Sequence, residues 1–158
     1  MPSSQAIPSM TAIYNLAVTV AANNLPPASI TSPDTTVGVY YSVAPAQQFN
    51  PQFFIAITGI EADKQVPTYI GLGRAEEFEI SGVVWGGVVD PSTANLQTLT
   101  GYLVGLLNAL DTAINVDPSL GGLLIQSWLA DYTLEFDVEN QGKAAFLTFA
   151  VHCEALTS

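Results

Sequence analysis

Hydrophobic and polar residues alternate most regularly near the C-terminus of the chain. Apolar residues alternate with threonine and acidic residues over 132–138, and a second alternating stretch follows over 145–153. A period of two is typical of strands that bury one face. The pattern therefore predicts a β-hairpin over residues 132–155, with Phe136 opposite Leu147, because both apolar faces then coincide. The polar face of the first strand would carry the carboxylates of Glu135, Asp137 and Glu139.

Apolar residues at spacings of three and four mark two helices. The longer one is predicted over residues 94–116, where Ser92 or Thr93 is placed to cap its first turn. A shorter pattern predicts a first helix over Ser9–Asn23, which the following pair of prolines would end. The apolar stripe of the long helix consists of Leu96, Leu99, Leu103, Leu106, Leu110 and Ile114.

Two strands and a long polar segment are expected between the helices. Phe53–Ile60 is an uncharged run expected to be covered on both faces, and Glu76–Trp85 alternates like a half-buried strand. Residues 26–51 are too long for an ordinary connection, so we expect a mobile loop or contact arm there. The strand-like piece Val37–Val43 would supply its contact residues, namely Val37, Val39, Tyr40 and Tyr41.

These elements predict a single domain of the α+β class. We expect an antiparallel sheet of about four to five strands, with the N-terminal and long helices packed on one face. The segment DPSLGG, Asp117–Gly122, joins the long helix to the next strand. Asp117 and Pro118 would stop the helix, and Leu120 would fold back onto its last turn. The two glycines would allow the positive φ angles of a sharp reversal.

The composition narrows the possible partners. Charged residues make up 11% of the 158 residues, and three cations face 14 acidic residues, for a net charge of -11. Direct phosphate binding is not expected, because affinity for nucleic acids depends on cations. Such an acidic surface would repel DNA, and a protein that forms a conduit for DNA would need this property. A high net charge also keeps any protein from aggregating, so the charge alone does not identify a conduit.

The compartment is suggested by the N-terminus and by cysteine content. Cys153 is the only cysteine, so no internal disulfide can form, and we expect it to be a small buried residue in a strand. The N-terminal apolar stretch follows no basic segment and is shorter than a membrane span. We therefore expect a chain that folds in the cytoplasm without a membrane anchor.

The residues capable of chemistry do not form a recognisable active site. The predicted register places the only histidine, His152, opposite Asp131, and no nucleophile in a strained turn accompanies them. Glu76, Glu77 and Glu79 are expected to lie on a solvated strand, the last two on one face. A zinc site needs more histidine and cysteine than the chain has. The short glycine-rich stretch Gly71–Gly73 precedes a strand and does not open a helix, so it does not match a dinucleotide-binding loop. We expect no catalytic residue, metal or cofactor.

Several stretches taken together resemble one protein family. Over Phe53–Ala155 the chain has a strand FEISGVVWGG, a Ser/Thr-rich turn, a long apolar helix, the turn DPSLGG and a closing hairpin. This arrangement resembles the tail terminator or tail-completion proteins of long-tailed bacteriophages. The long helix departs from the family's pattern, because family members carry many Arg and Glu there, whereas Asp111 is the only charge within Gly101–Asn115. A helix that is apolar nearly all round must be covered on more than one side, for example by a neighbouring subunit.

The resemblance implies a structural virion protein without catalytic activity. It would form a hexameric ring on the last ring of the tail tube, end tail polymerisation and present the surface that joins the head. Its partners would be further copies of itself, the tail-tube protein and the head-completion or connector protein. DNA would pass through the lumen without specific binding, along the carboxylates of Glu135, Asp137 and Glu139. The protein would lie at the head-proximal end of the virion tail, and in the host cytoplasm during assembly.

Other interpretations stay open at this point. Another head-tail connector or a tail-tube protein would share ring symmetry and an acidic lumen, and a tube protein would form filaments on its own. A small-ligand-binding module would use the long loop as a lid over a pocket lined by Trp85, Trp128 and Tyr132. A hydrolase that depends on His152 is a third hypothesis, which loss of activity in His152→Ala would support.

Overall fold

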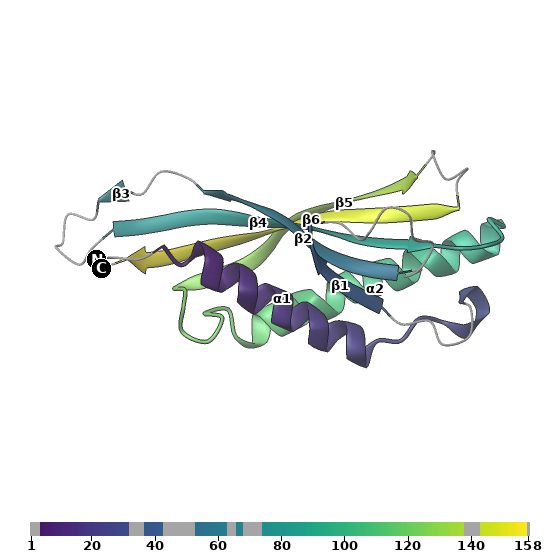
Figure 1. The fold of residues 1–158 in the computed structure, drawn as a ribbon, viewed down its shortest axis with the longest axis horizontal. Coiled ribbons are helices and arrows are strands. Elements are labelled where there is room, and N and C mark those ends of the chain that lie inside the picture. The colour runs from purple at the N-terminus through teal and green to yellow at the C-terminus, as the bar shows by residue number, and fades with distance from the viewer. Residues whose placement is uncertain are drawn as a thin grey trace.

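The computed structural model describes residues 4–31, 37–42, 53–62, 66–67, 74–137 and 143–157. They form two α-helices, a short 3-10 helix and six strands (Figure 1). The helices are α1 (Ala6–Asn23), η1 (Ala28–Ile30) and α2 (Thr93–Val116). The strands are β1 (Val37–Tyr41), β2 (Phe53–Ala62), β3 (Val66–Pro67), β4 (Arg74–Gly87), β5 (Gln126–Asp137) and β6 (Ala144–Thr157).

All described strands belong to one sheet, in the order β1-β2-β4-β6-β5, with β3 beside β4. Both α-helices lie on the same side of this sheet (Figure 1). The predicted α+β class and the placement of both helices on one face are therefore confirmed. The expected all-antiparallel sheet is wrong in one pair, because β1 runs parallel to β2. A parallel pair needs a crossover of about a dozen residues, and the long connection after β1 provides that length.

The C-terminal hairpin forms, but its register differs from the predicted one by two residues. Phe136 pairs with Ala145, and Leu147 pairs with Leu134 instead. A shift of two keeps every side chain on its predicted face, so alternation alone cannot distinguish the two registers. The paired strands also extend beyond the predicted hairpin, with an irregularity between Leu129 and Asp131.

The core lies between the helices and one face of the sheet. β2 contributes Phe53, Ile55 and Ile57 to this layer, all nearly inaccessible to solvent. The helices cover only one face of β2, which corrects the expectation of a strand covered on both. α2 contributes its predicted stripe, of which the fully buried members are Leu99, Leu103, Leu106, Leu110 and Ile114, and Leu107 beside the stripe is equally buried.

Two glycines of β4 let large side chains lie directly on the strand. A Cβ atom at Gly82 would collide with Cζ of Phe149 and stand 2.8 Å from the backbone oxygen of Ala56. A Cβ atom at Gly86 would stand 2.7 Å from Cδ1 of Phe53. The absence of side chains at these positions therefore brings two phenylalanine rings into the core layer.

Hydrogen bonds fix the beginning of α2 and its junction with α1. The predicted cap Ser92 precedes the helix, and its hydroxyl accepts a hydrogen bond from the backbone N–H of Asn95 at 3.2 Å. The hydroxyl of Tyr102 donates to the backbone oxygen of Asn24, at the end of α1. Burial raises the pKa of Tyr102 to about 12, so the phenol stays a donor throughout the neutral range.

Replacing Ser9 with alanine should stabilise the fold by about 1 to 2 kcal/mol. Ser9 lies in α1 with no exposed surface, and its hydroxyl finds no hydrogen-bond partner within the described ranges. Urea denaturation of Ser9→Ala measures the effect. Thr11→Ala removes an exposed hydroxyl from the same helix, and water can replace its hydrogen bond to the Ile7 carbonyl, so this variant reports mainly the gain in helix propensity, about 0.5 kcal/mol. Equal gains in the two variants would contradict a desolvation cost at Ser9.

Candidate functional site

The face of the sheet away from the helices is uncovered in the described chain and is strongly acidic. Side chains of directly paired residues share a face, so the registers of β2, β4, β5 and β6 assign each carboxylate to one side. Carboxylates gather here from all four strands, which neither helix shields. The members are Glu61, Glu77, Glu79, Asp131, Glu135, Asp137 and Glu154. We call this surface the open face.

Like charges stand directly opposite each other at one end of the open face. Glu61 pairs with Glu79, and Glu77 pairs with Glu154. Like charges in directly opposed positions destabilise a sheet. The fold thus holds an arrangement that stability alone does not favour, which makes this end a candidate for a functional surface.

His152 lies among these carboxylates, with an acidic group near each ring nitrogen. Its Nδ1 is 3.8 Å from Oε1 of Glu79, and its Nε2 is 3.5 Å from Oε1 of Glu154. Trp128 lies against the imidazole, with ring centroids 4.6 Å apart. His152 pairs with Trp128 and not with Asp131, which corrects the predicted pair. The two-residue change of register and the irregularity in β5 account for the difference.

Three of these side chains form a possible metal-ligating group. Glu77, His152 and Glu154 each place one ligand atom within 4.8 Å of the others. Carboxylate and imidazole donors suit divalent manganese or zinc, although Gln126 already donates to Oε2 of Glu154 at 2.6 Å. Sequence reasoning missed the group because only the register of β4 with β6 brings Glu77 to Glu154. The expectation that the chain holds no metal stays a prediction.

An aromatic row crosses the other end of the open face. Phe54 stacks on Trp85 with centroids 5.4 Å apart, and Tyr40 meets Phe54 edge-on at 6.1 Å. Trp85 is directly paired with Phe146, which continues the row onto β6. All four rings are half-buried. The row therefore covers part of the sheet face that neither helix covers, and it ends at Glu135, the partner of Phe146.

Glu76 lies on the opposite face from Glu77, as the alternation predicts, but it is buried and not solvated. Its Oε1 accepts a hydrogen bond from the backbone N–H of Gln5 at 2.8 Å, immediately before α1. A carboxylate at this position satisfies a free helical donor and interacts favourably with the helix dipole. Glu76 therefore ties the N-terminal helix to the beginning of β4, the middle strand of the sheet.

The structure places a tight reversal at Asp117–Gly122. α2 ends at Val116, Leu120 is buried, and positive φ angles occur at Leu120 (50°), Gly121 (77°) and Gly122 (88°). The hydroxyl of Ser119 and then the backbone N–H of Gly121 donate to the Asp117 carboxylate and hold its pKa below the usual value. This contribution to stability is present above the unfolded-state pKa and is lost as pH falls through the lowered value.

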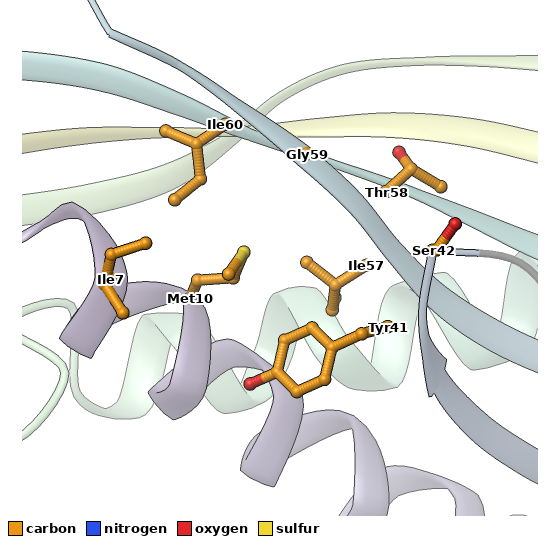
Figure 2. A pocket seen from close by; sticks show the side chains of 8 residues that line it. All are labelled: Ile7, Met10, Tyr41, Ser42, Ile57, Thr58, Gly59 and Ile60. Carbon is orange, nitrogen blue, oxygen red and sulfur yellow. The ribbon is translucent and has the colours of Figure 1, made fainter.

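An apolar pocket of about 320 Å³ lies on the helix side of the sheet, at the edge formed by β1 (Figure 2). β1 stops at Tyr41, where Ser42 turns away with a φ angle of 67°, whereas β2 continues. The gap beside β2 is bounded by the first turns of α1. The lining residues are Ile7, Met10, Tyr41, Ser42, Ile57, Thr58, Gly59 and Ile60.

The predicted contact residues at Val37, Val39, Tyr40 and Tyr41 form the edge strand β1 and not a free arm. Val37 and Val39 pack against the core, and the Tyr41 ring stacks on Tyr14 of α1 at 4.7 Å. The strand-like pattern of this piece was predicted, but its place in the sheet was not, because one short strand within a polar segment gives a weak pattern. Their role in contacts with other proteins stays a prediction. The rest of the proposed arm at 32–36 and 43–51 lies outside the described residues, as do Glu139 and Gly71–Gly73.

The three aromatic residues suggested for a ligand pocket do not come together. Trp85 lies on the open face beside Phe146, and Trp128 lies on the same face beside His152. Six residues of β6 separate these positions, which is about 20 Å along a strand. Tyr132 pairs with Phe149 and so lies on the helix side. The structure therefore does not support a pocket built from these residues.

Cys153 is completely buried in β6, as expected for a small apolar residue. Burial raises the pKa of its thiol to about 12, so the reactive thiolate is scarce at neutral pH. Within the described ranges, no helix combines the length and apolarity needed to cross a bilayer.

Comparison with known proteins gives similarity in structure alone. A scan against protein-family models found no match, and a search of curated proteins found none either. Among 28 similar chains of solved structures is one from the virion of a native gene transfer agent (GTA) particle. That chain matches with a TM-score of 0.52 and 7% sequence identity, over 94% of each chain. With so low a sequence identity, the similarity shows a shared fold, which extends over nearly the whole length of both chains.

Proposed function

We propose that the chain is a structural protein of a phage-like virion, where it closes the tail tube as a ring. The observation that supports a virion role most directly is the fold that this chain shares with a chain of a gene transfer agent virion, over 94% of both chains. The resemblance of its strand, helix, turn and hairpin to tail terminators supports the narrower role. In that role the ring ends tail polymerisation and joins the tail to the head.

The open face supports this proposal through its charge. With the open faces turned inward, the carboxylates would line the lumen, and Glu135 and Asp137 would belong to that lining. An acidic wall repels the DNA phosphates, so DNA slides past without sticking. In this arrangement the subunits meet through unlike edges, and rotation closes the ring without any chemical step. The outer partners are the tail-tube protein on one side and the head-completion or connector protein on the other.

Light scattering on a sizing column, at low and high protein concentration, tests the proposal together with negative-stain images of each peak. We expect a closed ring of about six subunits. Filaments would instead favour a tail-tube subunit. The proposal would be contradicted if the protein were monomeric at every concentration and the monomer also failed to bind purified tail tubes.

The orientation of the ring gives a separate test. A ring reconstruction with Glu135 and Asp137 on the outer wall would contradict the acidic lumen, because the open face would then point away from DNA.

A further inference from the structure

We propose that Tyr132 of one copy of this chain inserts into the apolar pocket on the β1 edge of a second copy, so that copies join head to tail. This inference rests on the proposed ring and names the contact that builds it. The pocket and Tyr132 lie at opposite edges of the same sheet, since β1 and β5 are its two outermost strands. A heterologous contact that forms a ring requires two different surface patches at opposite edges of each subunit.

Tyr132 is a large aromatic side chain that its own subunit leaves uncovered. It is 55% exposed, although its strand partner Phe149 is almost completely buried under the helices. The pocket is similarly open, because Ile7 is 62% exposed and Tyr41 is 46% exposed. Figure 2 shows Ile7, Met10 and Tyr41 gathered around the same space. Burying a tyrosine among such apolar side chains is favourable, and aromatic anchors of this kind dominate many interfaces.

The strand register places Tyr132 level with the pocket. Ile57, which lines the pocket, pairs with Gly82 across β2 and β4. Gly82 pairs with Phe149, and Phe149 pairs with Tyr132. The row of paired residues that begins at the pocket on one edge therefore ends at Tyr132 on the other. Two copies placed edge to edge without a shift bring Tyr132 directly to the pocket.

The contact also keeps all open faces on one side of the assembly. Tyr132 and Ile57 both point to the helix side, because they share the row of the buried Phe149. Copies joined through this contact thus continue the sheet from one subunit to the next with the same face inward. The acidic open faces then line one continuous wall, as the proposed lumen requires.

The charge distribution favours a second copy of this chain as the occupant. Residues 4–31 and 37–42, which supply α1 and β1, contain no charged side chain, although the chain has a net charge of -11. On the helix side, β5 offers uncharged residues as well, because its acidic residues point to the open face. Two strongly acidic copies can therefore approach at these two surfaces without direct repulsion between carboxylates.

Disulfide trapping between single variants tests the contact. Ile7→Cys and Tyr132→Cys proteins are mixed at equal concentration, oxidised with copper-phenanthroline and separated on a non-reducing gel. Both positions are exposed, so the substitutions should leave the fold intact, and the buried Cys153 thiol should not compete. We expect the mixed disulfide dimer to exceed each homodimer by about tenfold, because the contact raises the local thiol concentration.

Two matched variants provide the controls. Phe136→Cys lies on the same strand and face as Tyr132 and is 50% exposed, but it stands about 13 Å further along β5. Val18→Cys lies on α1 and is 42% exposed, but does not line the pocket. Mixtures of Ile7→Cys with Phe136→Cys, or of Val18→Cys with Tyr132→Cys, should give no excess of mixed dimer.

The outcomes separate this inference from the proposed function. Closed rings of the wild-type protein without a preferred mixed disulfide would overturn the Tyr132 contact and leave the ring standing. A preferred mixed disulfide in a protein that forms only open chains would support the contact and contradict the ring. A predominance of the Tyr132→Cys homodimer would show a two-fold symmetric contact and overturn the inference.

Discussion

Replacing Leu106 with alanine should lower the free energy of unfolding by about 4 kcal/mol and the melting temperature by about 8 to 16 °C. Leu106 is 1% exposed and lies on the face of α2 that packs against the sheet. Truncation removes apolar contacts and leaves a cavity that the surrounding strands cannot close, because α2 is held between its cap at Ser92 and the reversal after Val116. Urea denaturation monitored by circular dichroism measures the loss.

The control for this prediction is Asn108→Ala on the exposed face of the same helix. It should change the free energy of unfolding by no more than about 0.5 kcal/mol, because it removes no buried contact. Both proteins must be measured at a concentration where they have the same oligomeric state, since assembly adds to apparent stability. Equal losses in the two variants would mean that α2 is not packed on the sheet as described.

Gly82→Ala should lower the free energy of unfolding by about 2 to 3 kcal/mol, although it adds only one methyl group. The new carbon would collide with the Phe149 ring and with the backbone oxygen of Ala56. The ring can shift, but the carbonyl belongs to the neighbouring strand and cannot move without breaking the pairing of β2 with β4. Thermal unfolding measures the effect.

Gly59→Ala is the matched control, since it makes the same change in the neighbouring strand. A Cβ atom at Gly59 would meet no atom within 4 Å, so we expect a small gain or no change. If Gly82→Ala is as well tolerated as Gly59→Ala, the close approach of Phe149 to β4 is incorrect.

The sequence predicts the elements well wherever the pattern repeats over several turns or pairs. The stripe of α2 and the alternation of β5 and β6 identify those elements, because burial on one side imposes a fixed period. The same period leaves the register open, since a shift of two residues preserves every face. The predicted partner of His152 was wrong for this reason, and the irregularity after Leu129 has no signal in the alternation.

The candidate site was harder to predict than the fold, because its parts come from distant segments. The pocket combines α1, the end of β1 and β2, and the His152 group combines β4 with β6. Each depends on the order of strands in the sheet, which local patterns do not determine. β1 was predicted as a strand-like piece, but its pairing with β2 was not, because only five residues carry its pattern within a segment of turn-forming residues.

The parallel pairing of β1 with β2 has a consequence for the order in which the protein can form during synthesis. α1 and β1 leave the ribosome before the rest of the sheet, but both pack on β2, which is made later, and Gln5 binds Glu76, which is later still. From β2 onward, the neighbours in the sheet are antiparallel. β4 can pair with β2 as it emerges, whereas β5 joins the sheet only through β6, the last strand. The uncharged N-terminal unit must therefore wait, with its apolar surface uncovered, until the rest of the sheet gives it a place to dock.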